Sequence, residues 1–220
     1  MRTIQITGKG QIKVKPDMTR ITLSLEGTCP EYGETLRKSS EDTERLKDLL
    51  MAFGFEPTDL KTLNFSVDTK YESYKYKDTY KRRFVGYRFQ HMMKLEFESD
   101  NNRLGKILYA LANCPEKPEF YLSYTVKDTE TVKNELLKKA VTDAKEKAFV
   151  LTHAAGVTLK DIQSIDYSWS QINFEFKPMN RMLMPSISCD SMGGSESYDM
   201  DIEPDDIEVS DTVTVLWEIG

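Results

Sequence analysis

The parity of the first fifteen residues constrains the fold of this chain more than any other feature. From residue 4 to residue 14, every second position along the chain is apolar or glycine: Ile4, Ile6, Gly8, Gly10, Ile12 and Val14. Side chains of a β-strand alternate between two faces, so these residues share one face of a predicted strand. The glycines leave part of that face bare, which indicates that a helix or another backbone packs closely there. A phosphate-binding glycine loop is disfavoured, because Pro16-Asp17 predicts a turn and no helix follows.

Apolar periodicity predicts the remaining elements. Alternation indicates strands in five further segments, marked by Ile21, Leu23 and Leu25; by Leu63, Phe65, Val67 and Tyr71; by Val85 through Phe97; by Phe120, Leu122, Tyr124 and Val126; and by Ile165, Tyr167 and Trp169. A final strand spans Ile207 to Ile219, where Asp211 interrupts the apolar parity. A strand of this kind, with one apolar face, packs that face against another layer.

Helical spacing predicts three helices. The first contains Tyr32, Leu36, Leu46, Leu49, Leu50 and Phe53 around a polar middle, and the second follows a capping Asp100 with Leu104, Ile107, Leu108 and Leu111. The third begins near Asp128, ends at Gly156 and carries a narrow stripe of Val132, Leu136, Ala140, Ala144, Ala148, Leu151 and Ala155. The alanines of this stripe permit close approach to a sheet, and we expect it to cover the glycines of the first strand.

These elements follow the order ββαββαβαββ, which predicts an α+β fold of mostly antiparallel sheets packed against helices. We expect residues 1–220 to form a single domain. Between residues 171 and 206 the apolar period fails, and serines, prolines, methionines and acidic residues accumulate. The sequence predicts a mobile insertion between the last two strands there, ordered by a partner if it is ordered at all.

The opening pattern resembles the SIMPL-domain family, also called domain of unknown function 541. The Ile-x-Ile-x-Gly-x-Gly-x-Ile-x-Val strand, Pro16-Asp17, Gly86-Tyr87, the alanine-rich helix and the final Val-rich strand carry the resemblance. It covers the chain except roughly residues 170–203. The resemblance implies an α+β fold, ring-like oligomers in some members, export in the usual bacterial member and no known catalytic residue.

Composition narrows the function classes. The longest apolar run is too short to span a bilayer, and a net charge of −6 argues against bulk affinity for nucleic acid. Cys29, Cys114 and Cys189 are odd in number and widely spaced, which favours a reducing compartment over a disulfide framework. Because Arg2 and Thr3 lead directly into the first strand, we predict a cytoplasmic location, with the periplasm as the alternative if a signal peptide was removed.

The strongest candidate for a contact surface is the segment from Lys70 to Arg83. Aromatic rings alternate with cations here, and the contact candidates are Tyr71, Tyr74, Tyr76, Tyr80, Arg82 and Arg83. A solvated hairpin tip or a docking surface for an acidic partner is favoured over base stacking, because Glu72 and Asp78 dilute the charge. An acidic run from Glu196 to Glu208 offers a complement within one subunit or between subunits.

A second candidate is a cluster of sulfur ligands. Met179, Met182, Met184 and Cys189, with Met192 behind them, offer thioether and thiol groups that suit Cu(I). Adaptable apolar contacts to a partner account for the methionines more simply, so no metal and no cofactor is predicted. His91 lies on an apolar parity, which indicates a buried, hydrogen-bonded ring.

The leading interpretation is a non-catalytic, oligomeric SIMPL-like domain that acts through protein contacts, and the resemblance implies a role in stress tolerance or signalling. Its predicted partners are further copies of itself and an unidentified protein. The alternative is a soft-metal or stress-sensing protein that uses the Met-rich segment. A nucleic-acid-binding module comes third and an undescribed enzyme last, because the sequence shows no catalytic constellation.

Overall fold

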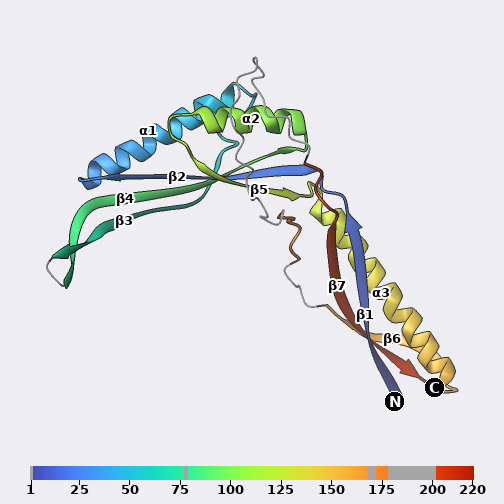
Figure 1. The fold of residues 1–220 in the computed structure, drawn as a ribbon. Helices are drawn as coiled ribbons and strands as arrows, with labels where there is room; N and C mark the ends of the chain where they lie inside the picture. The colour runs from blue at the N-terminus through green and yellow to red at the C-terminus, as the bar shows by residue number, and fades with distance from the viewer. Residues whose placement is uncertain (1, 77–78, 168–171, 178–201) are drawn as a thin grey trace. The chain divides into compact units, whose positions relative to one another are not determined.

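The computed structural model describes residues 2–76, 79–167, 172–177 and 202–220. The elements follow the predicted order ββαββαβαββ, and the fold is α+β with two antiparallel sheets and three helices (Figure 1). Their bounds are β1 (Arg2–Val14), β2 (Met18–Cys29), α1 (Tyr32–Met51), β3 (Lys61–Tyr76), β4 (Thr79–Glu98), α2 (Asn101–Asn113), β5 (Glu119–Thr125), α3 (Thr129–Ala154), β6 (Leu159–Asp166) and β7 (Ile207–Ile219). Contacts divide the chain into two compact units, and each is described separately below.

Unit 2 contains residues 18–123, and its four-stranded sheet has the order β3-β4-β2-β5. Helices α1 and α2 lie on one face of this sheet (Figure 1). The core between sheet and helices is built from the residues that the apolar patterns predict, among them Ile21, Leu23, Leu25, Phe89, Met93, Leu95, Leu104, Ile107 and Leu111. Helix α2 begins as predicted, because the Asp100 carboxylate accepts hydrogen bonds from the backbone N–H groups of Asn102 and Arg103.

Unit 1 contains residues 1–17, 124–176 and 204–220, and its three-stranded sheet has the order β1-β7-β6. Strands β1 and β7 pair antiparallel over their whole length, from Arg2 opposite Ile219 to Val14 opposite Ile207. Helix α3 covers the sheet over β1 and β7, as the sequence predicts. Its N-terminus is capped by Asp128, whose side chain accepts from the backbone N–H of Thr131.

The glycines of β1 lie directly beneath α3. A Cβ at Gly8 would overlap the carbonyl oxygen of Ala140 and stand 2.5 Å from the backbone nitrogen of Ala144. At Gly10 it would overlap the carbonyl oxygen of Leu136. The close packing expected from the sequence is therefore confirmed, since only glycine lets the helix backbone approach this strand.

The buried face of α3 differs from its prediction at one end. Leu136, Ala140, Ala144 and Ala148 are fully buried as expected, but the stripe continues through Thr152. Leu151 and Ala155 are exposed. A helix turns 100° per residue, so a four-residue repeat keeps Thr152 in line with Ala148, whereas Leu151 rotates out of that line.

Strand β6 and strand β5 also correct the sequence prediction. Strand β6 ends at Asp166, earlier than the predicted strand of Ile165, Tyr167 and Trp169, and Trp169 lies outside the described residues. Phe120 of β5 is exposed rather than inward. In both strands one free edge lowers burial, and apolar parity alone does not show which strand lies at an edge.

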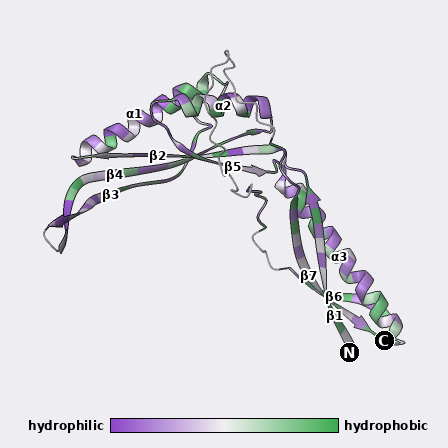
Figure 2. Cartoon of the chain, in the orientation of Figure 1, coloured by the Kyte–Doolittle hydropathy of each residue, from purple (hydrophilic) through white to green (hydrophobic). Residues whose placement is uncertain are grey.

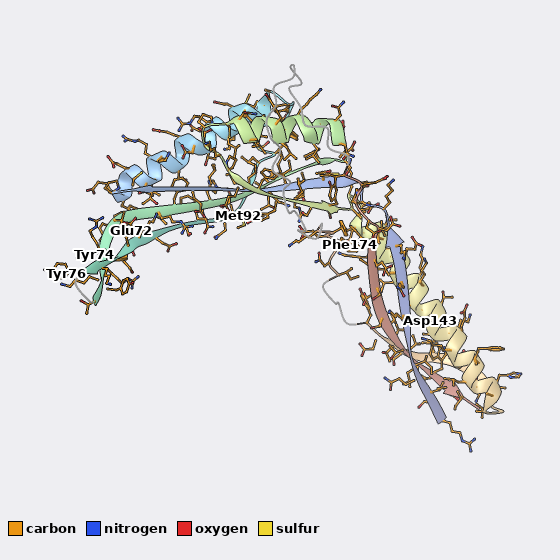
Figure 3. All side chains as sticks on the ribbon, viewed as in Figure 1. Glu72, Tyr74, Tyr76, Met92, Asp143 and Phe174 are labelled. Carbon is orange, nitrogen blue, oxygen red and sulfur yellow. The ribbon has the colours of Figure 1, made fainter. Side chains whose placement is uncertain are left out.

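Part of the segment 171–206 is described. Phe174, labelled in Figure 3, is buried in a cluster with Ile12, Leu136 and Val209. Phe176 exchanges two backbone hydrogen bonds with Tyr124. These residues contribute to the core of unit 1. Residues 178–201 of the predicted insertion lie outside the described residues.

Candidate protein-contact surface

Strands β3 and β4 extend beyond the rest of their sheet as a two-stranded ribbon. Strand β2 pairs with β4 only as far as Cys29 opposite Tyr87, whereas β3 and β4 stay paired to Tyr76 opposite Thr79. The ribbon begins at a bulge in β4, where Val85 is skipped and Gly86 has a φ of 150°. The predicted hairpin tip is therefore a long paired ribbon, visible at the left of Figure 1.

Pairing distributes the six predicted contact residues over two faces. Residues directly opposite each other in a ladder point to the same side. Tyr71, Tyr80 and Arg82 lie on the side of the sheet that carries α1, because Tyr71 faces Phe84 and Arg82 faces Ser73. Tyr74, Tyr76 and Arg83 lie on the opposite side, and the first two project near the end of the ribbon (Figure 3).

On the helix side, aromatic rings form a continuous row. Tyr71 meets Phe84 edge to face at 5.6 Å, Phe84 meets Tyr87 at 5.4 Å, and Tyr87 meets Tyr32 of α1 at 5.3 Å. Phe65 continues the same side of β3. We call Tyr32, Phe65, Tyr71, Phe84 and Tyr87 the aromatic shelf. Four of these five side chains are at least 44 % exposed, which is unusual for a group of large apolar residues in contact.

Cations stack on the ribbon aromatics. The Arg82 guanidinium lies 5.3 Å from the centroid of the Tyr71 ring, and the Lys81 ammonium lies 4.4 Å from that of Tyr76. Arg83 stands 3.8 Å from Glu72, a loose pair in solvent. Residues 70–83 contain six lysines and arginines but only two acidic residues. The ribbon is therefore basic, although the net charge of the whole chain is −6.

His91 lies next to the shelf and is hydrogen-bonded as its sequence position predicts, but it is half-buried rather than buried. Its Nδ1 is 3.0 Å from the Thr43 hydroxyl, its Nε2 is 2.9 Å from the Thr62 hydroxyl, and the Phe65 ring meets it edge to face. Burial lowers the pKa of His91, and the nearby charge of Lys47 lowers it further. Both ring nitrogens are engaged in hydrogen bonds that join α1, β3 and β4.

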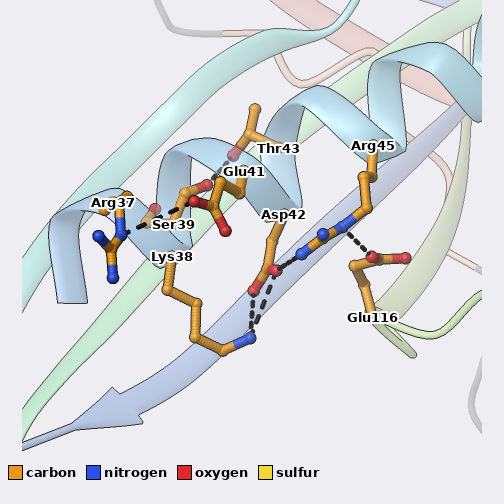
Figure 4. A network of polar contacts seen from close by, with 8 residues as sticks. All are labelled: Arg37, Lys38, Ser39, Glu41, Asp42, Thr43, Arg45 and Glu116. Atoms are coloured by element: carbon orange, nitrogen blue, oxygen red, sulfur yellow. Dashed lines mark hydrogen bonds and ion pairs between the residues drawn. The ribbon is translucent and has the colours of Figure 1, made fainter. Parts of the chain in front are cut away.

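The other side of α1 carries a network of ion pairs (Figure 4). Asp42, whose side chain is almost buried, binds Lys38 at 3.1 Å and Arg45 at 2.7 Å, and Arg45 also binds Glu116 at 2.6 Å. These residues and Pro115 line a shallow pocket of about 270 Å³. Because every charge in it has an opposite partner, the pocket presents no net charge to a ligand.

The predicted metal ligands Met179, Met182, Met184 and Cys189 lie outside the described residues. In the parts of the chain that the structure does describe, no three His, Cys, Asp or Glu side chains gather as a metal site. None of the helices there is long and apolar enough to cross a membrane.

Sequence analysis anticipated Tyr71 but missed most of the shelf. Tyr32 and Phe65 were assigned to apolar faces of a helix and a strand, and both are half exposed. The polar middle of α1 is visible in the sequence, but the sequence does not show that these polar residues are the buried ones. Thr35, Ser39, Asp42 and Thr43 are the polar residues that α1 buries, and this places Tyr32 at the margin of the helix.

The described residues form an α+β protein with two antiparallel sheets, and the aromatic shelf is its largest exposed apolar feature among the described side chains. Residues 4–217 match the family described as SIMPL, protein of unknown function (DUF541), and the chain belongs to this family. The resemblance stated from the sequence is therefore confirmed over nearly the whole chain.

Two relatives illustrate the family. The chain is 23 % identical over 217 residues to "Uncharacterized protein YggE" of Edwardsiella ictaluri, covering 97 % of this chain and 85 % of that protein. It is 27 % identical over 163 residues to the "26 kDa periplasmic immunogenic protein" of Brucella melitensis, covering 74 % of this chain and 65 % of that protein. Neither name states an activity.

Proposed function

We propose that this chain is a non-catalytic, self-assembling protein that works through protein contacts made by the aromatic shelf and the basic ribbon. One observation carries the proposal: the rings from Tyr32 to Tyr71 form a connected, solvent-exposed row on one side of unit 2. Exposed apolar groups of this extent favour a protein partner. Ribbon cations and the acidic character of the whole chain supply electrostatic attraction between copies.

A two-stranded ribbon gives further support. An isolated pair of strands is marginally stable in water, because neither face is covered. Here both faces carry aromatic residues that are close to half exposed, including Tyr71 on one face and Tyr74 and Tyr76 on the other. A partner that covers either face would stabilise the ribbon and bury apolar surface at once.

Sedimentation of the purified protein tests this function. We expect an oligomer at micromolar concentration, and a substantially smaller species when Tyr71 and Phe84 are both replaced by Ser. Tyr121→Ser is the matched control, because Tyr121 is also exposed but lies on β5. Higher salt should weaken an association that depends on ribbon cations, whereas aromatic burial should persist. A wild-type monomer at both low and high salt would contradict the proposal.

The cytoplasmic location stays a prediction. The name of the Brucella relatives supports the periplasmic alternative, and the absence of a disulfide framework in the sequence supports the cytoplasm. Immunodetection in separated cytoplasmic and envelope fractions of the native cell would decide between the two.

A further inference from the structure

The outer edge of β3 is a long and regular strand edge. In the part of the chain that the structure describes, the sheet order β3-β4-β2-β5 gives β3 one neighbouring strand, β4. From Asn64 to Tyr76 its residues pair with β4 one after another, and the irregularity at Lys70/Tyr71 arises because Val85 of β4 is skipped. The sequence of this stretch contains no proline. Its outward N–H and C=O groups therefore form an uninterrupted row, which is the template that strand addition requires.

Within the described residues, the side of β3 that faces α1 is only partly covered. Helix α1 packs on β2 and β4. Phe65 and Tyr71 of β3 are 44 % and 49 % exposed, and Val67 between them is half-buried. A strand added to this edge would place every second side chain beside these three residues.

We propose that β3 of a second copy occupies this edge, antiparallel, with the two-fold axis at Thr69. This inference rests on the proposed self-assembly and names one of its interfaces. It joins the two four-stranded sheets into one continuous sheet, in which Phe65, Val67 and Tyr71 of both copies lie between the two α1 helices.

The charges of β3 favour this register over axes at the charged residues. The two-fold axis must lie between the two copies of a single residue. If the pairing shifted by one position, the apolar side of one strand would lie on the polar side of the other. An axis at Asp68, Lys70 or Glu72 sets that charged residue against its own copy, which is unfavourable. An axis at Thr69 instead sets Asp68 opposite Lys70 of the partner subunit, and does so twice by symmetry.

The apolar side agrees with the same axis. At Thr69 it sets Val67 opposite Tyr71 of the partner subunit, and pairs of aromatic with β-branched residues are among the favourable cross-strand combinations. An axis at Tyr71 also pairs opposite charges, Lys70 with Glu72 of the partner subunit. However, that axis sets the apolar Val67 opposite the charged Lys75 of the partner subunit, so the pairing is favourable on the charged side of the sheet and unfavourable on the apolar side.

A charge exchange tests the register. We expect Asp68→Lys to weaken association at least tenfold, because it creates two like-charged pairs, and Lys70→Asp to do the same. The double variant Asp68→Lys/Lys70→Asp should restore association, measured by sedimentation velocity across a concentration series. Glu72→Lys is the matched control and should leave association unchanged. An effect of Glu72→Lys without an effect of Asp68→Lys would overturn the axis at Thr69.

Cross-linking tests the symmetry independently. Opposed Cβ atoms of paired strands lie about 4.5–5.5 Å apart, close enough that a small shift of the strands brings them to the roughly 3.5–4.5 Å of a disulfide. In a chain with Cys29→Ser and Cys189→Ser, mild oxidation of Thr69→Cys should yield a covalent dimer, whereas Val67→Cys should not. Thr69 is exposed, so this substitution is expected to leave the fold intact. An oligomeric protein that gives no Thr69→Cys dimer would refute this interface and leave the proposed function standing, whereas a monomeric wild type would refute the function itself.

Discussion

Gly8 and Gly10 set how closely α3 approaches its sheet. Because a Cβ at either position would fall on the helix backbone, a side chain here cannot be accommodated by rotating a neighbour. We predict that Gly8→Val lowers the free energy of unfolding by about 3 kcal/mol, the upper range for overpacking. Urea denaturation measures this. Gly33→Ala is the control, since a Cβ there meets nothing within 4 Å, and equal stability of Gly8→Val and wild type would contradict the close packing.

His91 is expected to make stability depend on pH. Its pKa is lowered in the folded state by burial and by Lys47, so the unfolded chain binds more protons as the pH falls through about 6.5. The stabilising contribution is present above that pH and is lost as the pH falls towards the folded pKa. We predict that wild-type protein loses more stability between pH 7.5 and 5.5 than His91→Asn does.

Denaturant unfolding at the two pH values measures this difference. His153→Asn is the matched control, because His153 is the other histidine of the chain and its side chain is exposed. Identical pH dependence in wild type and His91→Asn would show that the ring does not titrate differently in the folded state.

Single residues also show which features can be predicted from the sequence and which cannot. The parity of β1 revealed both glycines, because a bare position inside a strand marks a bulge or a close neighbour. Asp211 was seen as an interruption of β7, but its burial and its hydrogen bond from the Tyr167 hydroxyl at 3.0 Å could not be predicted. That bond joins residues 44 positions apart, and no local pattern encodes it.

Helix α1 is the element whose burial the sequence misjudged. The sequence shows its polar middle but not that Thr35, Ser39, Asp42 and Thr43 are buried, and much of the helix is hydrophilic in Figure 2. The hydroxyls of Thr35 and Thr43 donate to backbone carbonyls one turn earlier, and the Thr43 hydroxyl also lies 3.0 Å from Nδ1 of His91. Short polar side chains that bond to their own helix can therefore be buried, and hydropathy does not report this.

The ion-pair network of α1 yields a prediction at this scale. Asp42 and Glu116 are nearly buried carboxylates that share Arg45, so removing the guanidinium leaves both with less compensation. We predict that Arg45→Met lowers the thermal midpoint clearly, whereas Arg37→Met, which removes an exposed pair with Glu41 at 3.8 Å, changes it little. Calorimetry compares the two, and equal midpoints would show that the network does not stabilise α1.

At the scale of the whole molecule, the two units differ in how many separate segments of the chain form them. Among the described residues, the buried core of unit 2 comes from one stretch of the chain, Ile21 to Leu111, whereas the sheet of unit 1 combines both ends of the chain around β7. The order of elements and the α+β class followed from periodicity. The division into units did not, because strand pairing between distant segments leaves no local signal, and the single domain stays a prediction.

Removing β7 should therefore affect one unit. We predict that deleting residues 207–220 abolishes amide protection in β1 and α3, because the central strand of their sheet is lost, while β2, β4 and α2 keep theirs. Hydrogen exchange with mass spectrometry resolves the two sets of peptides. Loss of protection in both units, or in neither, would show that their stabilities are not separate.

The pairing of β1 with β7 also has a consequence during synthesis. The last residue of β1 and the first of β7 are residues 14 and 207, so at ribosomal rates the first strand waits about 10–40 s for its neighbour. Throughout this time a nascent chain presents Ile4, Ile6 and Ile12 on an unpaired strand. Chaperones that shield short apolar segments at the ribosomal exit tunnel are expected to bind the first fifteen residues of this chain. The yield of the protein in cells should therefore depend on such chaperones more than the equilibrium stability of the folded protein does.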